Sequence, residues 1–224
     1  MLGTLVNVGT IIVGSLVGGL VKKVLKEEYS NCLFTAMGLA AFGLGMNSIV
    51  QNMPNSQYPV LFIASLALGS LIGTILKIDD KVQAISSKSS DGGKLGEGLI
   101  TGCLLYCIGT LSILGPVQSA LYQDHTFLFT NAMLDLVTSM VLASTYGIGM
   151  ALAAVILFAW QGSIYGLTML LGNFITDTMM TELSIVGGFL ILSSGMAILG
   201  IKNCKTLNML PSLVIPVIWC LIVA

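Results

Sequence analysis

A single carboxylate inside an apolar stretch is the residue of this sequence best suited to chemistry. Asp135 occurs in NAMLDLVTSMVLAST, within an apolar segment at positions 127–147. If this segment crosses a membrane as a helix, the rise of roughly 1.5 Å per residue places Asp135 about a third of the way across the hydrocarbon core. Asn131, Thr138 and Ser139 share its helical face. Carboxylate, amide and hydroxyl oxygens suit a small cation, and a carboxylate also takes up a proton, so these four residues predict an ion or proton site.

Two other polar side chains lie in or beside apolar segments, and each has two interpretations. Gln161 lies near the middle of the segment at 149–171, where its amide needs hydrogen-bond partners. It either joins helices or contacts a substrate. Glu182 lies near the start of the next apolar segment, in TDTMMTELSIVGG. It either belongs to a capped helix start, with Asp177 or Thr181 as the cap, or lines an external entrance.

The remaining reactive side chains do not predict a site for catalysis, a metal or a cofactor. His125 is the only histidine, in YQDHTF, and the five cysteines lack paired metal-ligand spacing. Cys103 and Cys107 share a helical face, but without a nearby histidine or carboxylate they are better interpreted as small packing residues. The sequence has no HExxH, GxSxG, P-loop or GxGxxG pattern and no basic patch with interleaved aromatics. We therefore expect no enzyme, no metal, no cofactor and no nucleic-acid partner.

Composition predicts the elements that position these residues. Of 224 residues, 55% are hydrophobic and only 8% are charged, against roughly 25% charged in a soluble domain. Runs long enough to cross a bilayer recur along the chain. The sequence therefore predicts an all-α fold, a polytopic transmembrane bundle of about eight helices in the lipid bilayer, as one integral membrane domain over residues 1–224. The apolar segments are predicted at Thr4–Val21, Cys32–Val50, Pro59–Leu76, Gly98–Gly115, Phe127–Gly147, Gly149–Leu171, Leu183–Ile201 and Leu207–Val223.

The polar residues between the segments predict the topology. The stretch at about 78–97 contains SSKSSDGGKLGEG and is predicted to be a flexible cytoplasmic linker. The sequence has no arginine, and all nine lysines follow the first, third or seventh segment, which places them on one side of the membrane. Cytoplasmic loops are enriched in positive charge, so both termini are predicted to be external. The fifth and sixth segments either both span the membrane or form a re-entrant pair, and either arrangement leaves the lysines on one side.

Two nearly identical nonapeptides predict close helix packing. GSLVGGLVK begins at Gly14, and GSLIGTILK begins at Gly69. Each contains a small-xxx-small pair, Gly14 with Gly18 and Gly69 with Gly73, which lets a second helix backbone approach closely in lipid.

A fainter similarity and two prolines also bear on the helices. Residues 38–46 and 188–196 share two glycines and a methionine in the same register, within segments predicted to run in opposite directions. An inverted-topology repeat is one interpretation of this pattern. Pro211 and Pro216 predict that the last segment is bent or interrupted, because proline removes a backbone donor.

Four motifs, in order along the chain, resemble those of the YqgA/YdfK-like proteins, a domain-of-unknown-function family of small bacterial inner-membrane proteins. They are GTLVNVGTIIVGSLVGGL, LGSLIGTILKIDDKV, FTNAMLDLVTSMVLASTYGIG and ELSIVGGFLILSSGMAILGIKNCKTLNMLP. The resemblance covers nearly the whole chain and implies a single polytopic domain in a bacterial plasma membrane. It implies no activity. By similarity, Asp135 and Glu182 match acidic positions in the family's motifs.

Together these features favour a secondary transporter or ion-coupled permease for a small solute, with Asp135 as its proton or cation site. The alternative is a non-transporting assembly or sensor subunit. In that case Asp135 and Gln161 bond other helices, or Asp135 lies at the membrane interface, and the glycine stripes mediate oligomerisation, for example as a homo-oligomer.

Overall fold

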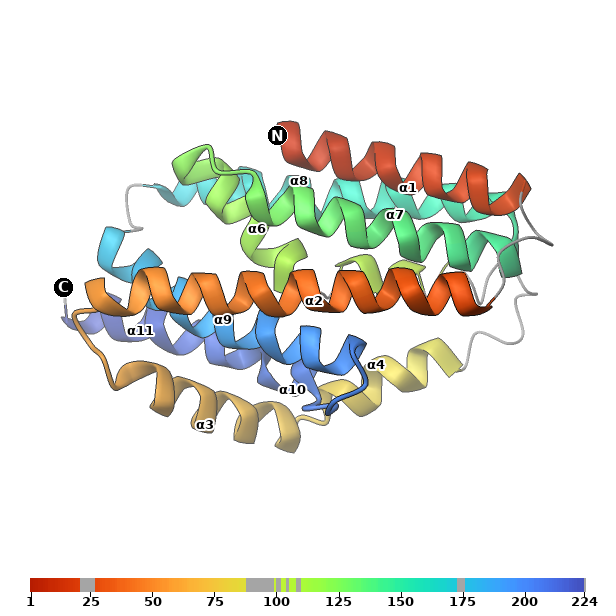
Figure 1. The fold of residues 1–224 in the computed structure, drawn as a ribbon. Coiled ribbons are helices and arrows are strands. Elements are labelled where there is room, and N and C mark those ends of the chain that lie inside the picture. The colour runs from red at the N-terminus through yellow and green to blue at the C-terminus, as the bar shows by residue number, and fades with distance from the viewer. Residues whose placement is uncertain are drawn as a thin grey trace. The chain divides into compact units, whose positions relative to one another are not determined.

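The structure, a computed structural model, describes residues 1–20, 27–87, 99, 102–103, 105–107, 110–172 and 176–223 (Figure 1). Every regular element in these ranges is a helix and none is a strand, so the predicted all-α class is confirmed. The elements are α1 (Leu2–Leu20), α2 (Glu27–Asn52), η1 (Met53–Asn55), α3 (Leu61–Ile75), α4 (Ile78–Ser87), α6 (Thr110–Tyr122), α7 (Thr126–Tyr146), η3 (Ile148–Leu152), α8 (Ala153–Leu171), α9 (Asp177–Ile198), α10 (Thr206–Met209), η5 (Leu210–Leu213) and α11 (Val214–Val223).

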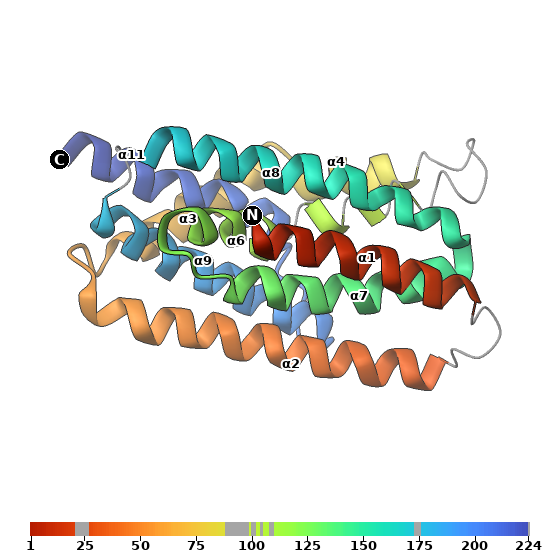
Figure 2. The same ribbon diagram turned by 90° about the horizontal axis from the view of Figure 1, so that it is seen from above.

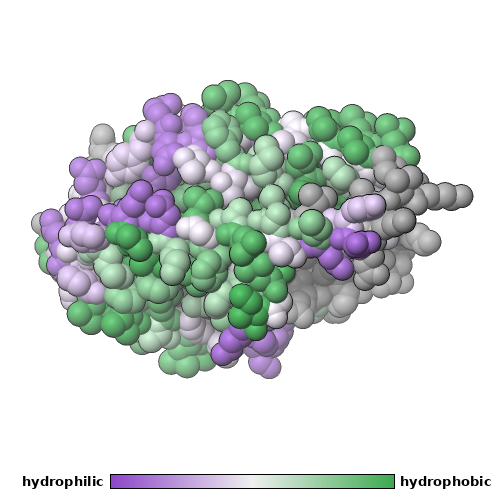
Figure 3. Space-filling model, in the orientation of Figure 1, coloured by the Kyte–Doolittle hydropathy of each residue, from purple (hydrophilic) through white to green (hydrophobic). Residues whose placement is uncertain are grey.

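Several helices have the length and composition of membrane spans. Among the described residues, 5 helical stretches are long and apolar enough to cross a bilayer, and α3 is a shorter apolar helix of 15 residues. The long stretches are Leu2–Leu20, Thr126–Tyr146, Ile148–Leu171, Asp177–Ile198 and Thr206–Val223. Large apolar side chains are exposed along these helices, and hydrophobic residues cover much of the face in Figure 3. The predicted membrane character is thereby supported, whereas the count of eight spans stays a prediction.

The chain divides into two compact units. Unit 1 consists of Met1–Met37 and Val82–Leu170, and unit 2 consists of Gly38–Lys81 and Leu171–Ala224. Helices α2 and α4 each begin in one unit and end in the other. This division does not test the prediction that residues 1–224 form one membrane domain, which therefore stays a prediction.

Three predicted boundaries differ most from the structure. The stretch at 78–97 is not a linker throughout, because Ile78–Ser87 forms α4 and only the part beyond residue 87 lies outside the described residues. The left-handed backbone at Lys77 separates α3 from α4. Two acidic residues in the first turn of α4, Asp79 and Asp80, interact favourably with the positive end of its helix dipole. The fourth segment was expected to end at Gly115, yet α6 continues through the buried Pro116 to Tyr122.

The third boundary is the start of the seventh segment. Helix α9 begins at Asp177 rather than Leu183, since Thr176 caps it by accepting a hydrogen bond from the Met179 N–H at 3.2 Å. Neither Asp177 nor Thr181 is the capping residue, which corrects the sequence interpretation. A serine or threonine hydroxyl at this position supplies an acceptor for a backbone donor that has none within the helix.

Gly147 separates the fifth and sixth segments. Its φ of +101° lies in the region that favours glycine, and it ends α7 before the short helix η3. Helix α7 has 21 residues and the stretch from η3 through α8 has 24, so each is long enough to cross a core of roughly 30 Å. These lengths favour two full spans over a re-entrant pair.

In unit 1, α1 packs along α7, and both views show the two helices side by side (Figures 1 and 2). A Cβ atom at Gly14 would lie 2.5 Å from the carbonyl oxygen of Leu136, and one at Gly18 would meet the carbonyl of Met140. Gly14 meets Leu136 and, four residues on, Gly18 meets Met140, so α1 and α7 run in the same direction. The glycines therefore allow backbone contact between α1 and α7.

In unit 2, the other two glycines of the predicted stripes face the last helix. Gly69 lies against Ser212 and Gly73 lies against Asn208, with no room for a Cβ atom at either glycine. The last helix is interrupted there, because α10 gives way to the 3₁₀ turn η5, which contains Pro211. The predicted interruption is confirmed.

The faint similarity between residues 38–46 and 188–196 corresponds to a direct contact in unit 2. A Cβ atom at Gly45 would lie 2.6 Å from the carbonyl oxygen of Gly188, and one at Gly195 would lie 2.6 Å from the backbone nitrogen of Phe42. Helices α2 and α9 thus touch backbone to backbone in opposite directions. Whether the similarity also marks an inverted repeat stays a prediction.

We predict that Gly18→Ala destabilises the protein by about 1–3 kcal/mol, because the added Cβ would meet the Met140 backbone rather than a flexible side chain. The matched control is Gly9→Ala in the same helix, where nothing lies within 4 Å of the added atom. This control is expected to be neutral or about 0.5–1 kcal/mol more stable, because alanine favours helix. Thermal unfolding of the variants in detergent measures the difference. Equal Tm values for the two variants would contradict the close approach.

Candidate functional site

Asp135 lies on the buried face of α7, and its side chain is only 4% exposed. Helix α7 buries residues at spacings of one to four, and this stripe carries polar as well as apolar side chains. Its members are Leu128, Asn131, Ala132, Asp135, Val137, Ser139 and Ala143. Three of the four residues predicted for the ion site, Asn131, Asp135 and Ser139, therefore share one buried surface inside unit 1.

Hydrogen bonds connect these three residues to each other and to a tyrosine. The Asn131 amide donates to Oδ2 of Asp135 at 2.9 Å. The Ser139 hydroxyl donates to the backbone carbonyl of Asp135 and accepts a hydrogen bond from the Tyr106 hydroxyl at 3.1 Å. The carboxylate thus receives one donor from its own helix, and the network continues away from it through Ser139 to Tyr106.

Helix α1 contributes a second amide to the site. The Asn7 side chain is fully buried and its amide faces the Asp135 carboxylate as a donor, although this contact falls outside the geometry of the hydrogen bonds described above. The Thr10 hydroxyl of the same helix donates to the backbone carbonyl of Asn7 at 2.7 Å and lies 3.4 Å from the side-chain oxygen Oδ1 of Asn7. Two amides, those of Asn131 and Asn7, thus adjoin the buried carboxylate and provide polar groups that a ligand at this point can contact.

The charge of Asp135 has no counter-ion among the residues that the structure describes. No lysine or histidine in the described residues forms an ion pair with it, and His125 instead lies with Nδ1 2.9 Å from the Ser119 hydroxyl. An isolated carboxylate in an apolar interior is too costly to keep in the charged form alone. Asp135 is therefore held either as the neutral acid or together with a bound cation.

Three further hydroxyl groups of unit 1 are buried without a partner. They belong to Thr4 and Ser15 on α1 and to Thr110 at the start of α6. A buried hydroxyl left unpaired costs about 1–3 kcal/mol, so proteins leave few of them. Unit 1 therefore has unused hydrogen-bonding groups on the helix that faces Asp135.

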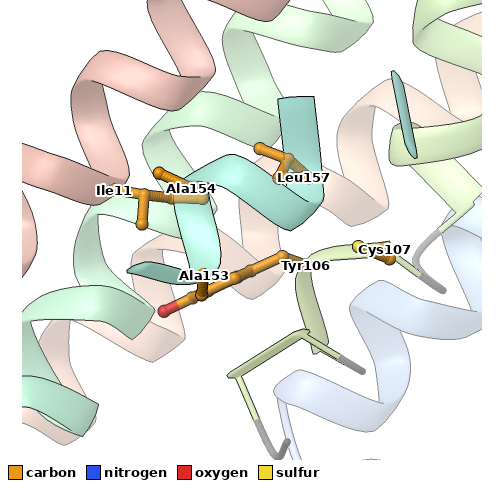
Figure 4. Close-up of a cluster of buried hydrophobic side chains, with 6 residues drawn as sticks. All are labelled: Ile11, Tyr106, Cys107, Ala153, Ala154 and Leu157. Carbon is orange, nitrogen blue, oxygen red and sulfur yellow. The ribbon is translucent and has the colours of Figure 1, made fainter. Parts of the chain in front are cut away.

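An apolar wall closes the Tyr106 side of the network. Tyr106 packs with Ile11 of α1 and with Ala153, Ala154 and Leu157 of α8, and its phenol oxygen extends past Ala153 (Figure 4). Tyr106 is 1% exposed. The wall orients the phenol and keeps bulk water from this side of the hydrogen bonds.

Two other predicted site residues of unit 1 do not contact the carboxylate. Thr138 donates to the Leu134 carbonyl of its own helix at 2.8 Å. Gln161 is fully buried on α8 and donates to the Ser112 hydroxyl of α6 at 3.1 Å, while its amide oxygen has no partner. The Gln161 geometry supports the interpretation that it joins two helices.

Glu182 belongs to unit 2 and has its own partners there. It is 1% exposed on α9, and its Oε1 accepts hydrogen bonds from the Ser56 hydroxyl at 2.6 Å and the Tyr58 N–H at 3.1 Å. Since Glu182 lies beyond the first turn of α9, it is not part of the helix cap. It fixes the connection between α2 and α3 instead.

Comparison with known proteins identifies the family. A family model described as "Protein of unknown function (DUF554)" matches residues 2–221, nearly the whole chain. The chain belongs to the DUF554 family. The resemblance noted from the four sequence motifs is thereby confirmed.

Two relatives of this DUF554 chain cover it almost completely. The "Uncharacterized membrane protein YdfK" of Bacillus subtilis is 54% identical over 216 residues, covering 96% of this chain and 94% of the relative. The "Uncharacterized protein YqgA" of Escherichia coli is 26% identical over 225 residues, with the same coverage of each chain. No solved structure matches the chain.

Sequence reasoning missed two residues of this DUF554 site. Asn7 could have been found, because Asn7, Ile11, Gly14 and Gly18 follow one another at the three- and four-residue spacing of a helix face. Tyr106 gave a weaker signal, namely a phenol hydroxyl inside an apolar segment that must find a partner. In the described residues, no group of three or more His, Cys, Asp or Glu side chains could hold a metal ion.

We predict that Glu182→Ala destabilises the protein by about 2–3 kcal/mol, because the Ser56 hydroxyl and the Tyr58 N–H lose their buried acceptor. Glu182→Gln keeps an acceptor oxygen and is expected to lose less than half as much. Thermal unfolding and limited proteolysis at residues 53–60 measure the two variants. A glutamine variant as unstable as the alanine variant would show that the hydrogen bonds to Oε1 do not hold this connection.

Proposed function

We propose that this DUF554 protein is a secondary transporter or ion-coupled permease for a small solute, with Asp135 as the site that takes up a proton or a cation. One observation carries the proposal: a carboxylate that is 4% exposed, on a membrane-length helix, has no ion pair within the described residues. Ionisable residues inside spans are costly, and their usual roles are in ion pathways and proton relays.

The hydrogen bond to Asn131 alone would not require a carboxylate. An asparagine at position 135 would accept the same bond through its amide oxygen without an ionisable group. What aspartate adds is the capacity to gain and lose a proton, or to neutralise a cation. The Asn7 amide, which faces the Asp135 carboxylate, and the unpaired Ser15 hydroxyl on the same helix supply polar contacts for such a ligand.

Two features of the helices are consistent with movement between states. The glycine contacts of α1 with α7 let backbones slide past each other without interlocked side chains. The last helix is interrupted at η5, and discontinuous helices are common at the binding regions of secondary transporters.

We expect Asp135→Asn to abolish solute-dependent proton or cation movement in proteoliposomes. The measurement uses an entrapped pH-sensitive dye and a panel of small carboxylates, amino acids and inorganic cations. The variant should still fold, because asparagine preserves the size of the side chain and the acceptor for Asn131.

Thr138→Val in the same helix is the matched control, because its hydroxyl bonds only its own backbone. This variant should transport as the wild type does. Equal flux in wild type and Asp135→Asn would remove Asp135 from the mechanism. Absence of flux over the whole panel, together with copurification of a stoichiometric partner, would favour the alternative of a non-transporting assembly or sensor subunit.

We further propose that the chain crosses a bacterial inner membrane eight times, with both termini outside. The support is the position of the lysines, which all follow the first, third or seventh apolar segment.

A C-terminal alkaline phosphatase fusion is therefore expected to be active, and a C-terminal green fluorescent protein fusion is expected to be dark. A fusion in the loop around Lys202 should give the opposite pattern. Fluorescence of the C-terminal fusion would contradict the proposed topology.

A further inference from the structure

Two serine hydroxyls in unit 2 are buried without any hydrogen-bond partner. Ser65 on α3 and Ser212 in η5 are each 0% exposed, and neither Oγ atom is paired. Other serines of this unit are satisfied: Ser48 donates to the Ser184 carbonyl at 2.9 Å, and Ser193 lies 2.7 Å from the Thr206 hydroxyl. The two unpaired groups therefore contrast with the rest of unit 2.

The two hydroxyls lie on the same seam between α3 and the interrupted helix. The Ser212 Oγ atom is the nearest atom to a Cβ placed on Gly69. Ser65 lies one helical turn before Gly69 on the same buried face of α3, which also includes Leu61 and Gly73. The glycines bring the backbone of α3 directly against η5, so both serines line the contact.

The interruption adds backbone oxygen to this seam. Pro216 has no N–H, so the carbonyl of Ser212, four residues before it, lacks its usual α-helical donor. Inside an apolar protein, such a carbonyl needs another partner. The seam therefore has two unpaired hydroxyls, those of Ser65 and Ser212, next to a break in the α-helical hydrogen bonding.

We infer that this seam, lined by Ser65, Ser212 and Gly69, is a binding site for a small monovalent cation of the size of Na⁺. Neutral hydroxyl and carbonyl oxygens replace the water shell of a hard cation, whereas divalent cations are usually held by carboxylates as well. No room is left at Gly69 itself, so the ion is placed beside that contact, where the narrow approach of α3 and η5 favours Na⁺ over the larger K⁺. In secondary transporters, unwound backbone carbonyls coordinate Na⁺ at interrupted helices. The inference does not rest on the function proposed for Asp135.

The first experiment measures thermal unfolding of the purified full chain in detergent, in sodium, potassium or choline chloride at equal ionic strength. Wild type is expected to gain roughly 5–10 °C in Tm when sodium exceeds its dissociation constant about 100-fold, with a smaller gain in potassium. Equal Tm values in sodium and choline would overturn the inference and leave a bridging water as the partner of the two serines.

Ser65→Ala and Ser212→Ala test the site directly. Each removes a hydroxyl that has no protein partner, so neither variant should be less stable than wild type in choline. Both should lose the gain in sodium. The matched control is Ser70→Ala on α3, whose hydroxyl donates to the Leu66 carbonyl of its own helix. This control should keep the gain.

Binding of radioactive sodium to the detergent-solubilised protein provides a second readout that does not depend on unfolding. One sodium ion per chain is expected in wild type and in Ser70→Ala, and none in Ser65→Ala. Undiminished sodium binding in Ser65→Ala and Ser212→Ala would overturn the inference.

Discussion

Every polar group that an apolar helical protein buries must find its partner inside the protein, and both units follow from this requirement. Helices satisfy the backbone. Some hydroxyls satisfy themselves within one helix, as Thr138 and Ser70 do by donating to carbonyls four residues earlier. Others join helices, as Gln161 does with Ser112. Among the described residues, the buried groups that remain unpaired include Thr4 and Ser15 on α1 and Ser65 and Ser212 where α3 meets η5, while Thr110 and the Gln161 amide oxygen lie elsewhere in unit 1. The first two places are where we propose that ligands bind.

Glycine decides where these places are. In lipid, burying apolar side chains contributes little to helix association, so direct backbone contact has to contribute more. Gly14 lies against Leu136 and Ser139, next to Asp135 along α7, and so it fixes which face of α1 meets the carboxylate. Gly69 does the same for η5 in unit 2. Packing and polar chemistry are therefore set by the same few positions.

The all-α class and the position of Asp135 inside a long apolar helix could be predicted from the sequence, because apolar length and an isolated charge are local signals. The sequence also predicted that Gly14, Gly18, Gly69 and Gly73 lie at close contacts, but not their partners. The two copies of the nonapeptide face different elements: α1 meets a helix running the same way, and α3 meets an interrupted helix running the opposite way. Partners are set by tertiary arrangement, which a small-xxx-small pattern does not encode.

The misses have equally physical reasons. Helix α4 looks like a linker in sequence because its residues are polar. Its first turn is stabilised by a residue far away in the chain, since the Asn208 side chain accepts a hydrogen bond from the Asp79 N–H at 2.8 Å. Glu182 looks like part of a helix cap because it is acidic and close to a helix start. Its Oε1 atom instead accepts hydrogen bonds from Tyr58 and Ser56, which lie 124 and 126 positions earlier in the chain. Neither partner can be read from neighbouring residues.

The contact of Asn208 with α3 and α4 also bears on how the protein is made. Asn208 lies 129 positions after Asp79, and its backbone fills the groove at Gly73. During synthesis, α3 therefore enters the membrane with its glycine face uncovered. This face stays uncovered until α10 and η5 have left the ribosome. This part of unit 2 can be completed only after residue 208 has been synthesised, so a chain released before that residue would expose this groove to other membrane proteins or to quality-control proteases.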